Sequence, residues 1–287
     1  MEWKRTEERE ELKKLTSLGG GCIASLVKCQ GKKSGKTYVL KTNPTKAMNE
    51  AEMRGLEELA RCAEVRVPQV VAYGEDSLLL EFIPSKRASD RDQLALGKMV
   101  ARLHSCRGES FGLSHDNFIG ETPQINTPFS RWADFFWECR LGPQWQWARE
   151  KGFSSRLREE ELQNVVERFL GEKLEAEQDV FPSLLHGDLW SANWMASDQG
   201  VFLIDPAAFY GHWEMEFAMI HLFGGFSPAF FESYQKEFGA DLETSGFHQR
   251  QKLYRSYHLL NHYNLFGGHY GRKAEEELDN LLKLQDS

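Results

Sequence analysis

The sequence predicts a two-lobed α+β fold, in which a small β-rich lobe precedes a larger, mainly helical lobe. Short strand patterns with one inserted helix occupy residues 1–84, whereas apolar residues at helical spacing dominate residues 85–287. The chain has 287 residues, of which 41% are hydrophobic and 12% aromatic, enough to fill a core in each lobe. These two ranges, 1–84 and 85–287, are the predicted domains.

The first lobe is expected to hold about five strands and one helix, with a polar lead-in at residues 6–15 that is either a short helix or extended. The expected strands run up to the glycines at 19–21 and over 22–29, 37–43, 66–74 and 77–84. An amphipathic pattern at 46–63 predicts the helix. A short connection near 81–86 leads into the second lobe.

The second lobe is expected to be mostly helical around a long loop at 108–130. Helical spacing covers 91–105, 156–176, 229–238 and 248–265. Two short apolar segments, 183–188 and 200–206, are predicted strands that end in polar residues.

Composition restricts the partners of the chain. The formal net charge of −8 disfavours nucleic acid as the main ligand, although a local positive site for a small phosphate ligand stays compatible with it. No apolar run approaches the ~18 residues of a membrane span. The charged N-terminal segment lacks the apolar centre of a signal peptide, so we expect a cytoplasmic protein that does not associate with membranes.

The cysteines give no sign of a metal site. They are odd in number, scattered and without CxxC spacing: Cys22, Cys29, Cys62, Cys106 and Cys139. In a reducing compartment we expect free thiols and no zinc site.

The most informative stretch is LLHGDLWSANWM, followed by VFLIDP. It supplies Asp188, Asn193 four intervening residues later, and Asp205 after the next predicted strand. Phosphoryl transfer from MgATP needs a carboxylate beside the attacking hydroxyl and oxygen ligands for magnesium. We therefore predict Asp188 as the catalytic base and Asn193 and Asp205 as Mg²⁺ ligands. The alternative is that the first two are turn residues and that Asp205 caps a helix.

Lys41 ends the apolar strand TYVL, where a lysine can reach the phosphates of ATP if a carboxylate fixes it. Glu52 and Glu50 lie on the following helix, about 200° apart, so only one can face the sheet. We choose Glu52 and keep Glu50 as the alternative. All three could instead be surface charges.

Two further segments are candidates for binding ATP. Gly19, Gly20 and Gly21 form a turn about 20 residues before Lys41, where backbone N–H groups could approach phosphates, or they simply make a tight hairpin. Backbone groups of Glu81, Phe82 and Ile83, in the connection between the lobes, are placed to bind an adenine edge.

The sequence resembles the fructosamine kinases (ketosamine-3-kinases), which share a protein-kinase-like fold with aminoglycoside phosphotransferases and choline kinases. The resemblance spans nearly the whole chain and is carried by GGGCI (19–23), VLKTN (39–43), FGLSHDNFIGETPQINTP (111–128), LLHGDLWSANWM (184–195), IDPAAFYGH (204–212) and YHLLNHYNLFGG (257–268). It implies ATP-dependent, Mg²⁺-assisted phosphorylation of a ketosamine sugar at the 3-hydroxyl, on a free or protein-bound amine. The phosphate so formed eliminates, which deglycates the amine. Asp188, Asn193, Asp205, Lys41 and Glu52 match the family's catalytic, metal and phosphate-binding positions.

Two departures from the wider kinase pattern matter. Asp205-Pro206-Ala207 stands where protein kinases have Asp-Phe-Gly, so the flip that glycine permits is not expected. The catalytic loop begins His-Gly-Asp and lacks the arginine that reads an activation-loop phosphate. Regulation by such phosphorylation, and a protein hydroxyl as acceptor, are therefore not expected.

Substrate contacts are expected from the second lobe. Trp190 offers an aromatic face for a sugar, unless it only packs under the catalytic loop. Asn117 and Gln124 could bind hydroxyls or order the site, with hydrogen bonding within the loop slightly favoured. His258 and His262 have a spacing that can bind zinc, but without a third ligand we expect packing or pocket lining.

Cys22 is a candidate redox position, because several fructosamine kinases carry a cysteine in this loop and redox control through it has been described for the family. If 22–29 is one strand, Cys22 and Cys29 lie about 23 Å apart at ~3.3 Å per residue, too far for a disulfide. The chain is thus expected as a monomer or as a redox-dependent homodimer through Cys22; a small residue that merely fits the turn is the alternative.

Two other functions stay open at this point. One is a kinase of the same fold acting on another small alcohol, such as an aminoglycoside or an amino alcohol. The other is a catalytically silent redox or nucleotide sensor, which the presence of all five site residues disfavours.

Overall fold

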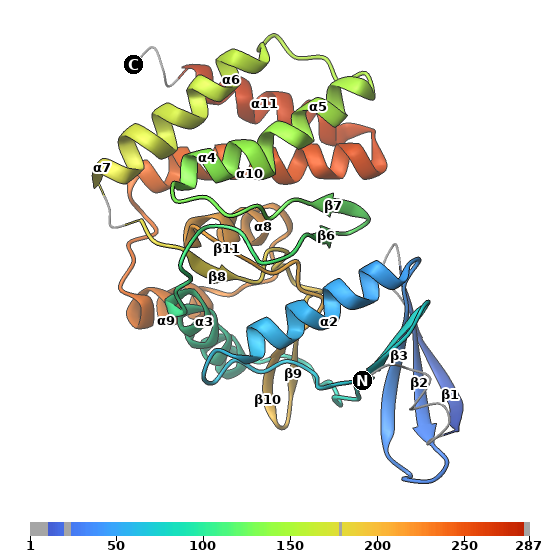
Figure 1. The fold of residues 1–287 in the computed structure, drawn as a ribbon. Coiled ribbons are helices and arrows are strands. Elements are labelled where there is room, and N and C mark those ends of the chain that lie inside the picture. Colours follow the sequence, from blue (N-terminus) through green and yellow to red (C-terminus); the bar gives the residue numbers. More distant parts are fainter. Residues whose placement is uncertain (1–10, 20–23, 178–179, 284–287) are drawn as a thin grey trace.

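The computed structural model describes residues 11–19, 24–177 and 180–283. Its first lobe is a five-stranded antiparallel sheet with strand order β1-β2-β3-β5-β4 and one long helix, α2. The elements are β1 (Leu12–Gly19), β2 (Ser25–Gly31), β3 (Thr37–Thr42), α2 (Lys46–Ala60), β4 (Val70–Tyr73) and β5 (Ser77–Glu81). Figure 1 shows this sheet at one end of the molecule, with the helical lobe at the other.

The second lobe is mainly helical and carries three two-stranded antiparallel sheets. Its helices are α3 (Asp90–Ser105), α4 (Trp132–Phe136), α5 (Gly142–Glu150), α6 (Glu159–Val166), α7 (Glu175–Glu177), α8 (Glu216–Phe223), α9 (Pro228–Phe238), α10 (Ser245–Phe266) and α11 (His269–Lys283). Wider turns of π-helix span Trp137–Leu141 and Glu167–Leu174, and a 3₁₀ turn spans Trp213–Met215. The small sheets pair β6 (Asn117–Ile119) with β7 (Thr122–Gln124), β8 (Ser183–Leu185) with β11 (Phe209–Gly211), and β9 (Trp194–Ser197) with β10 (Gly200–Leu203).

This is the predicted architecture, and its differences from the prediction are local. The second strand begins at Ser25, three residues later than expected, and the described part of the lead-in belongs to β1. The predicted loop at 108–130 contains the β6–β7 hairpin, whose three-residue strands are too short to show periodicity. The proposed boundary after residue 84 falls between β5 and α3.

Local sequence explains how α2 and α3 begin. The Thr45 side chain accepts a hydrogen bond from the Met48 N–H at the start of α2. Ser89 and Asp92 form a capping box at the start of α3, each side chain accepting from the other's backbone N–H. Each helix therefore begins at a side chain that caps its first turn.

No helix among the described residues has the length and apolar character needed to cross a bilayer.

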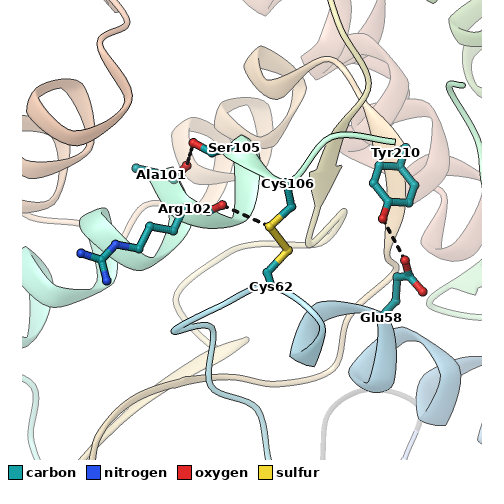
Figure 2. Close-up of a disulfide and its surroundings, with 7 residues drawn as sticks. All are labelled: Glu58, Cys62, Ala101, Arg102, Ser105, Cys106 and Tyr210. Atoms are coloured by element: carbon teal, nitrogen blue, oxygen red, sulfur yellow. Dashed lines mark hydrogen bonds between the residues drawn. A yellow bond between two sulfur atoms is a disulfide. The ribbon is translucent and has the colours of Figure 1, made fainter. Parts of the chain in front are cut away.

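The expectation of free thiols is wrong for Cys62 and Cys106, which form a disulfide (Figure 2). They are 44 residues apart, but the end of α2 packs beside the end of α3 and brings their Cα atoms to 6.2 Å. Within the same region the Tyr210 hydroxyl donates to Glu58 of α2 at 2.9 Å. Cys29 and Cys139 are buried free thiols. Sequence spacing could not show a pairing that depends on how two distant helices pack.

This bond should stabilise the fold by restricting the unfolded chain, typically by about 2–4 kcal/mol. We expect a reductant to lower the melting temperature of the wild-type protein by several degrees. The Cys62→Ala/Cys106→Ala variant should melt at a lower temperature and not respond to reductant, whereas Cys29→Ala should respond as wild type does. Equal melting of the wild type with and without reductant would contradict the prediction.

Candidate active site

A cavity of about 340 Å³ lies between the lobes and brings together seven of the predicted site residues. Its lining comes from β2, β3 and α2 in the first lobe and from the β6–β7 hairpin, the 188–193 loop and helices α8, α10 and α11 in the second. The candidate residues that line it are Lys41, Glu52, Asn117, Asp188, Trp190, Asn193 and Asp205. Residues separated by more than 160 positions thus meet at one site.

Lys41 is the central cation of the cavity. Its Nζ lies 2.8 Å from Glu52 Oε2 and 2.7 Å from Asp205 Oδ1. Burial would lower the pKa of Lys41, but Glu52 and then Asp205 raise it above its ordinary value, so the side chain stays protonated. The structure thus pairs Lys41 with Glu52, the carboxylate chosen over Glu50, and adds Asp205 as a second partner.

Asn43 also lines the cavity, and the sequence analysis did not identify it. Its Nδ2 donates to Glu52 Oε2 at 3.2 Å and to Asn49 Oδ1 at 3.0 Å, and Asn49 in turn donates to the Gly74 carbonyl. The Glu52 carboxylate is therefore fixed by Asn43 as well as by Lys41. The available signal was the asparagine two positions after Lys41, but only the fold shows that it faces α2.

Asp188 and Asn193 lie in one tight loop. Asn193 Nδ2 donates to the Asp188 carbonyl at 2.7 Å and to Asp188 Oδ2 at 2.9 Å. Burial raises the pKa of Asp188 to about 8; Asn193 opposes this shift, and the nearby carboxylates of Asp205 and Glu216 add to it. A carboxyl group with this pKa is suited to accept a proton near neutral pH.

Glu216 fixes the backbone at the start of this loop. Its carboxylate accepts the backbone N–H of His186 at 2.6 Å and of Gly187 at 3.0 Å, and His104 lies 3.5 Å away. Glu216 is 2% exposed. A lone glutamate at the start of the apolar segment EFAMIHLF was the signal for this role, and the sequence analysis did not use it.

The donors at Asp205 and Asn193 fit a Mg²⁺ ion. Asn193 uses its Nδ2 toward Asp188, so that its amide oxygen can serve as a ligand. Glu52, Asp188 and Asp205 bring three carboxyl groups to a cavity whose described lining includes Lys41 as its lysine, and a divalent cation would favour the ionised forms of these carboxyl groups. These are hard oxygen donors of the kind Mg²⁺ takes together with phosphates.

An aromatic wall continues the cavity away from the carboxylates. Its rings follow one another at centroid distances of 5.7 Å (Trp190–Phe223), 4.9 Å (Phe223–His262) and 5.1 Å (His262–Tyr270). Phe266 adds a ring that is 51% exposed at the edge. His262 Nδ1 lies 2.8 Å from the His258 carbonyl, and burial lowers the pKa of both histidines. His262 lines the cavity and His258 is buried. Over the part of the chain that the structure describes, no group of three His, Cys, Asp or Glu side chains is placed to hold a metal ion.

Asn117 and Gln124 point into the protein rather than across the cavity. Asn117 Nδ2 donates to the Ala208 carbonyl at 2.8 Å, and Gln124 Nε2 donates to Asn117 Oδ1 at 2.8 Å and to the Ala207 carbonyl at 3.1 Å. Both side chains are 3% exposed. Asn117 reaches the cavity lining and Gln124 does not. The bond between Gln124 and Asn117 lies within the predicted loop, which is the alternative that was slightly favoured from the sequence, and the other two reach the segment after Asp205.

Two further segments were predicted to bind ATP, the glycines at 19–21 and residues 81–83. The described residues of these segments do not line the cavity. Gly19 ends β1 opposite Leu26, while Gly20, Gly21 and Cys22 lie outside the described residues. Glu81 uses its own N–H within the sheet, donating to the Gln69 carbonyl at 2.9 Å. The adenine contact predicted for 81–83 therefore narrows to the Glu81 carbonyl and to the backbone of Phe82 and Ile83.

Comparison with known proteins assigns this architecture to a family. Residues 2–284 match the family described as fructosamine kinase. The chain is 37% identical to a probable ketoamine kinase of Synechocystis over 279 residues, covering 93% of this chain and 90% of the relative. It is also 37% identical to the chloroplastic protein-ribulosamine 3-kinase of Arabidopsis thaliana, covering 99% and 87% of the two chains.

Solved structures agree in fold. A putative fructosamine-3-kinase from Thermobifida fusca superposes with a TM-score of 0.83 at 28% identity, covering 98% of each chain. A thermostable mutant of aminoglycoside phosphotransferase APH(4)-Ia, in a ternary complex with ADP and hygromycin B, matches in fold alone, with a TM-score of 0.61 at 16% identity over 98% of this chain and 97% of its own. With a family match over nearly the full length and a cavity that gathers Lys41, Glu52, Asp188, Asn193 and Asp205, this chain belongs to the fructosamine kinase family.

Proposed function

We propose that the chain catalyses ATP-dependent phosphorylation of the sugar 3-hydroxyl of ketosamines, the step that leads to deglycation of amines or proteins. The observation that carries the proposal is the convergence of a lysine–glutamate pair and an Asp188–Asn193–Asp205 set on one cavity in a member of this family. The names of two relatives, probable ketoamine kinase and protein-ribulosamine 3-kinase, agree with this substrate class.

In this mechanism Asp188 orients the sugar hydroxyl and takes its proton. Lys41, fixed by Glu52, contacts the phosphates of ATP. Lys41 also contacts Asp205, and the phosphates and the metal would bind beside these two side chains. Asn193 and Asp205 would hold Mg²⁺, which when bound neutralises charge on the phosphates. Trp190 and the rest of the aromatic wall offer an apolar face to the sugar and its amine substituent.

Several finer statements belong to the same proposal. Gly19, Gly20 and Gly21 cover the phosphates, and Glu81, Phe82 and Ile83 bind adenine through backbone groups. Residues 1–84 and 85–287 act as nucleotide-binding and catalytic lobes in the cytoplasm. Dimerisation through Cys22 under oxidising conditions rests on the sequence resemblance alone.

A substrate panel tests the proposal most directly. With MgATP we expect turnover of ribulosamine or fructosamine that exceeds turnover of kanamycin and choline, measured as ADP release. Asp188→Asn serves as the matched control for contaminating kinases. Preferred turnover of kanamycin or choline would replace the substrate class, and no turnover of any compound would favour a sensor.

A further inference from the structure

Asp205 has an unusual backbone conformation, and the segment that follows it makes several hydrogen bonds. Asp205 has φ of 54°, in the left-handed region, where a residue with a side chain needs support from its surroundings. In Figure 1 the β6–β7 hairpin lies between α2 and α10, and Asn117 of β6 donates a hydrogen bond to the Ala208 carbonyl, three residues after Asp205. The question is which contacts keep Asp205 in this conformation.

One side of the segment is held by the catalytic loop. The Ala207 N–H donates to the His186 carbonyl at 2.9 Å, and His186 Nε2 lies 2.8 Å from the Ile204 carbonyl. Gly187, with φ of 82°, allows the two backbones to meet, since a Cβ there would stand 2.2 Å from the Ala207 oxygen. These contacts fix the backbone on both flanks of Asp205.

The other side is held by two buried amides. Gln124 donates to the Ala207 carbonyl and Asn117 to the Ala208 carbonyl, and Gln124 also donates to Asn117. We call this pair the amide clamp. Because both carbonyls are buried, each needs a donor, and losing one would cost about 1–3 kcal/mol.

The amide clamp is itself braced from the helical lobe. The Tyr257 hydroxyl donates to Gln124 Oε1 at 3.2 Å, and Asn126 Nδ2 donates to Asn117 Oδ1 at 2.8 Å. Arg140, 1% exposed, donates to Asn126 Oδ1 at 2.7 Å and lies over the rings of Phe135 and Phe209. The oxygen atoms of both clamp amides are thus occupied by protein donors, which leaves them little capacity to accept hydrogen bonds from a substrate.

We propose that Asn117 and Gln124 are positioning residues, which hold Asp205 in its left-handed conformation so that its carboxylate faces Lys41 and the metal site. They act through the main chain of Ala207 and Ala208 and do not bind the sugar. The kinetic part of this inference rests on the proposed function, whereas the structural part does not.

The test compares Gln124→Met, which keeps the side-chain length but removes the donor, and Asn117→Ala with Gln251→Ala. Gln251 is a matched control because it is also buried and donates to a main-chain carbonyl, that of Glu214, outside the cavity lining. Both clamp variants should raise the Mg²⁺ concentration for half-maximal activity by about 10- to 100-fold, the usual range for groups that support a metal ligand. The KM for ketosamine should change less than twofold, and Gln251→Ala should change neither.

Two measurements do not depend on turnover. Hydrogen exchange of peptides covering 203–211 should be faster in the clamp variants than in the control, and calorimetric binding of ADP should require more Mg²⁺. A raised ketosamine KM with unchanged Mg²⁺ dependence would overturn the proposal and make the pair substrate ligands. If the wild type turns over no ketosamine, the proposed function fails, while exchange and Mg²⁺-dependent ADP binding still decide the role of the clamp.

Discussion

Asp188→Asn is expected to lower the kcat of ketosamine phosphorylation by about 10²- to 10⁴-fold, the usual contribution of a general base. Asparagine keeps the shape and the contact with Asn193 but cannot accept the proton of the sugar hydroxyl. Binding of MgADP, measured by calorimetry, should stay largely intact because Lys41 and Asp205 are unchanged. Unchanged turnover would remove Asp188 from the role of base.

The same variant has a second expected effect, on stability in the absence of metal and nucleotide. Burial raises the pKa of Asp188 to about 8, from an unfolded value of about 4. The folded protein therefore loses stability as pH rises from about 4 to 8, since the unfolded chain ionises more easily, and the loss levels off above 8. Asp188→Asn should escape this loss, so its melting temperature should exceed that of the wild type by a margin that widens between pH 5 and 8. A constant margin over that range would mean that the Asp188 pKa is not raised.

Lys41→Met is expected to reduce kcat/KM for ATP by about 10²- to 10³-fold, in the range seen when one preorganised charge donor is removed. The change also leaves Glu52 and Asp205 without their shared cation, so some loss of thermal stability should accompany it. Steady-state kinetics at varied ATP would measure the first effect.

Two glutamine variants test whether the ion pair between Lys41 and Glu52 is specific, or whether any loss of a carboxylate from α2 lowers activity. Glu52→Gln removes a carboxylate that contacts Lys41 and should lower kcat/KM for ATP, whereas Glu50→Gln, two residues away on α2, should be close to wild type. Equal losses in the two variants would argue against a specific Lys41–Glu52 pair.

The site could be predicted from sequence where the chemistry is local. Asp188, Asn193 and Asp205 occur in order within 18 residues of chain, and Lys41 ends a recognisable strand. The two lobes also follow from periodicity, because strand and helix patterns change near residue 84. Apolar spacing and short motifs are properties of neighbouring residues, which is why they suffice here.

What the sequence did not show depends on long-range packing. Asn43 and Glu216 act through partners on other elements, and their types alone do not distinguish them from many other polar residues. The β9 strand, Trp194–Ser197, lies between the two predicted segments and was also missed. The Cys62–Cys106 bond was missed for the same physical reason: loop closure over 44 residues leaves no local signal.

That bond has a consequence for the integrity of the chain. Cys62 belongs to the first lobe and Cys106 to the second. The chain segment that connects the lobes lies between these two cysteines in the sequence. A protease cut in the connection at residues 82–88 would open that backbone, yet the two fragments would stay tied by sulfur until a reductant is added. The nicked protein would therefore run as one species on a non-reducing gel and as two on a reducing gel.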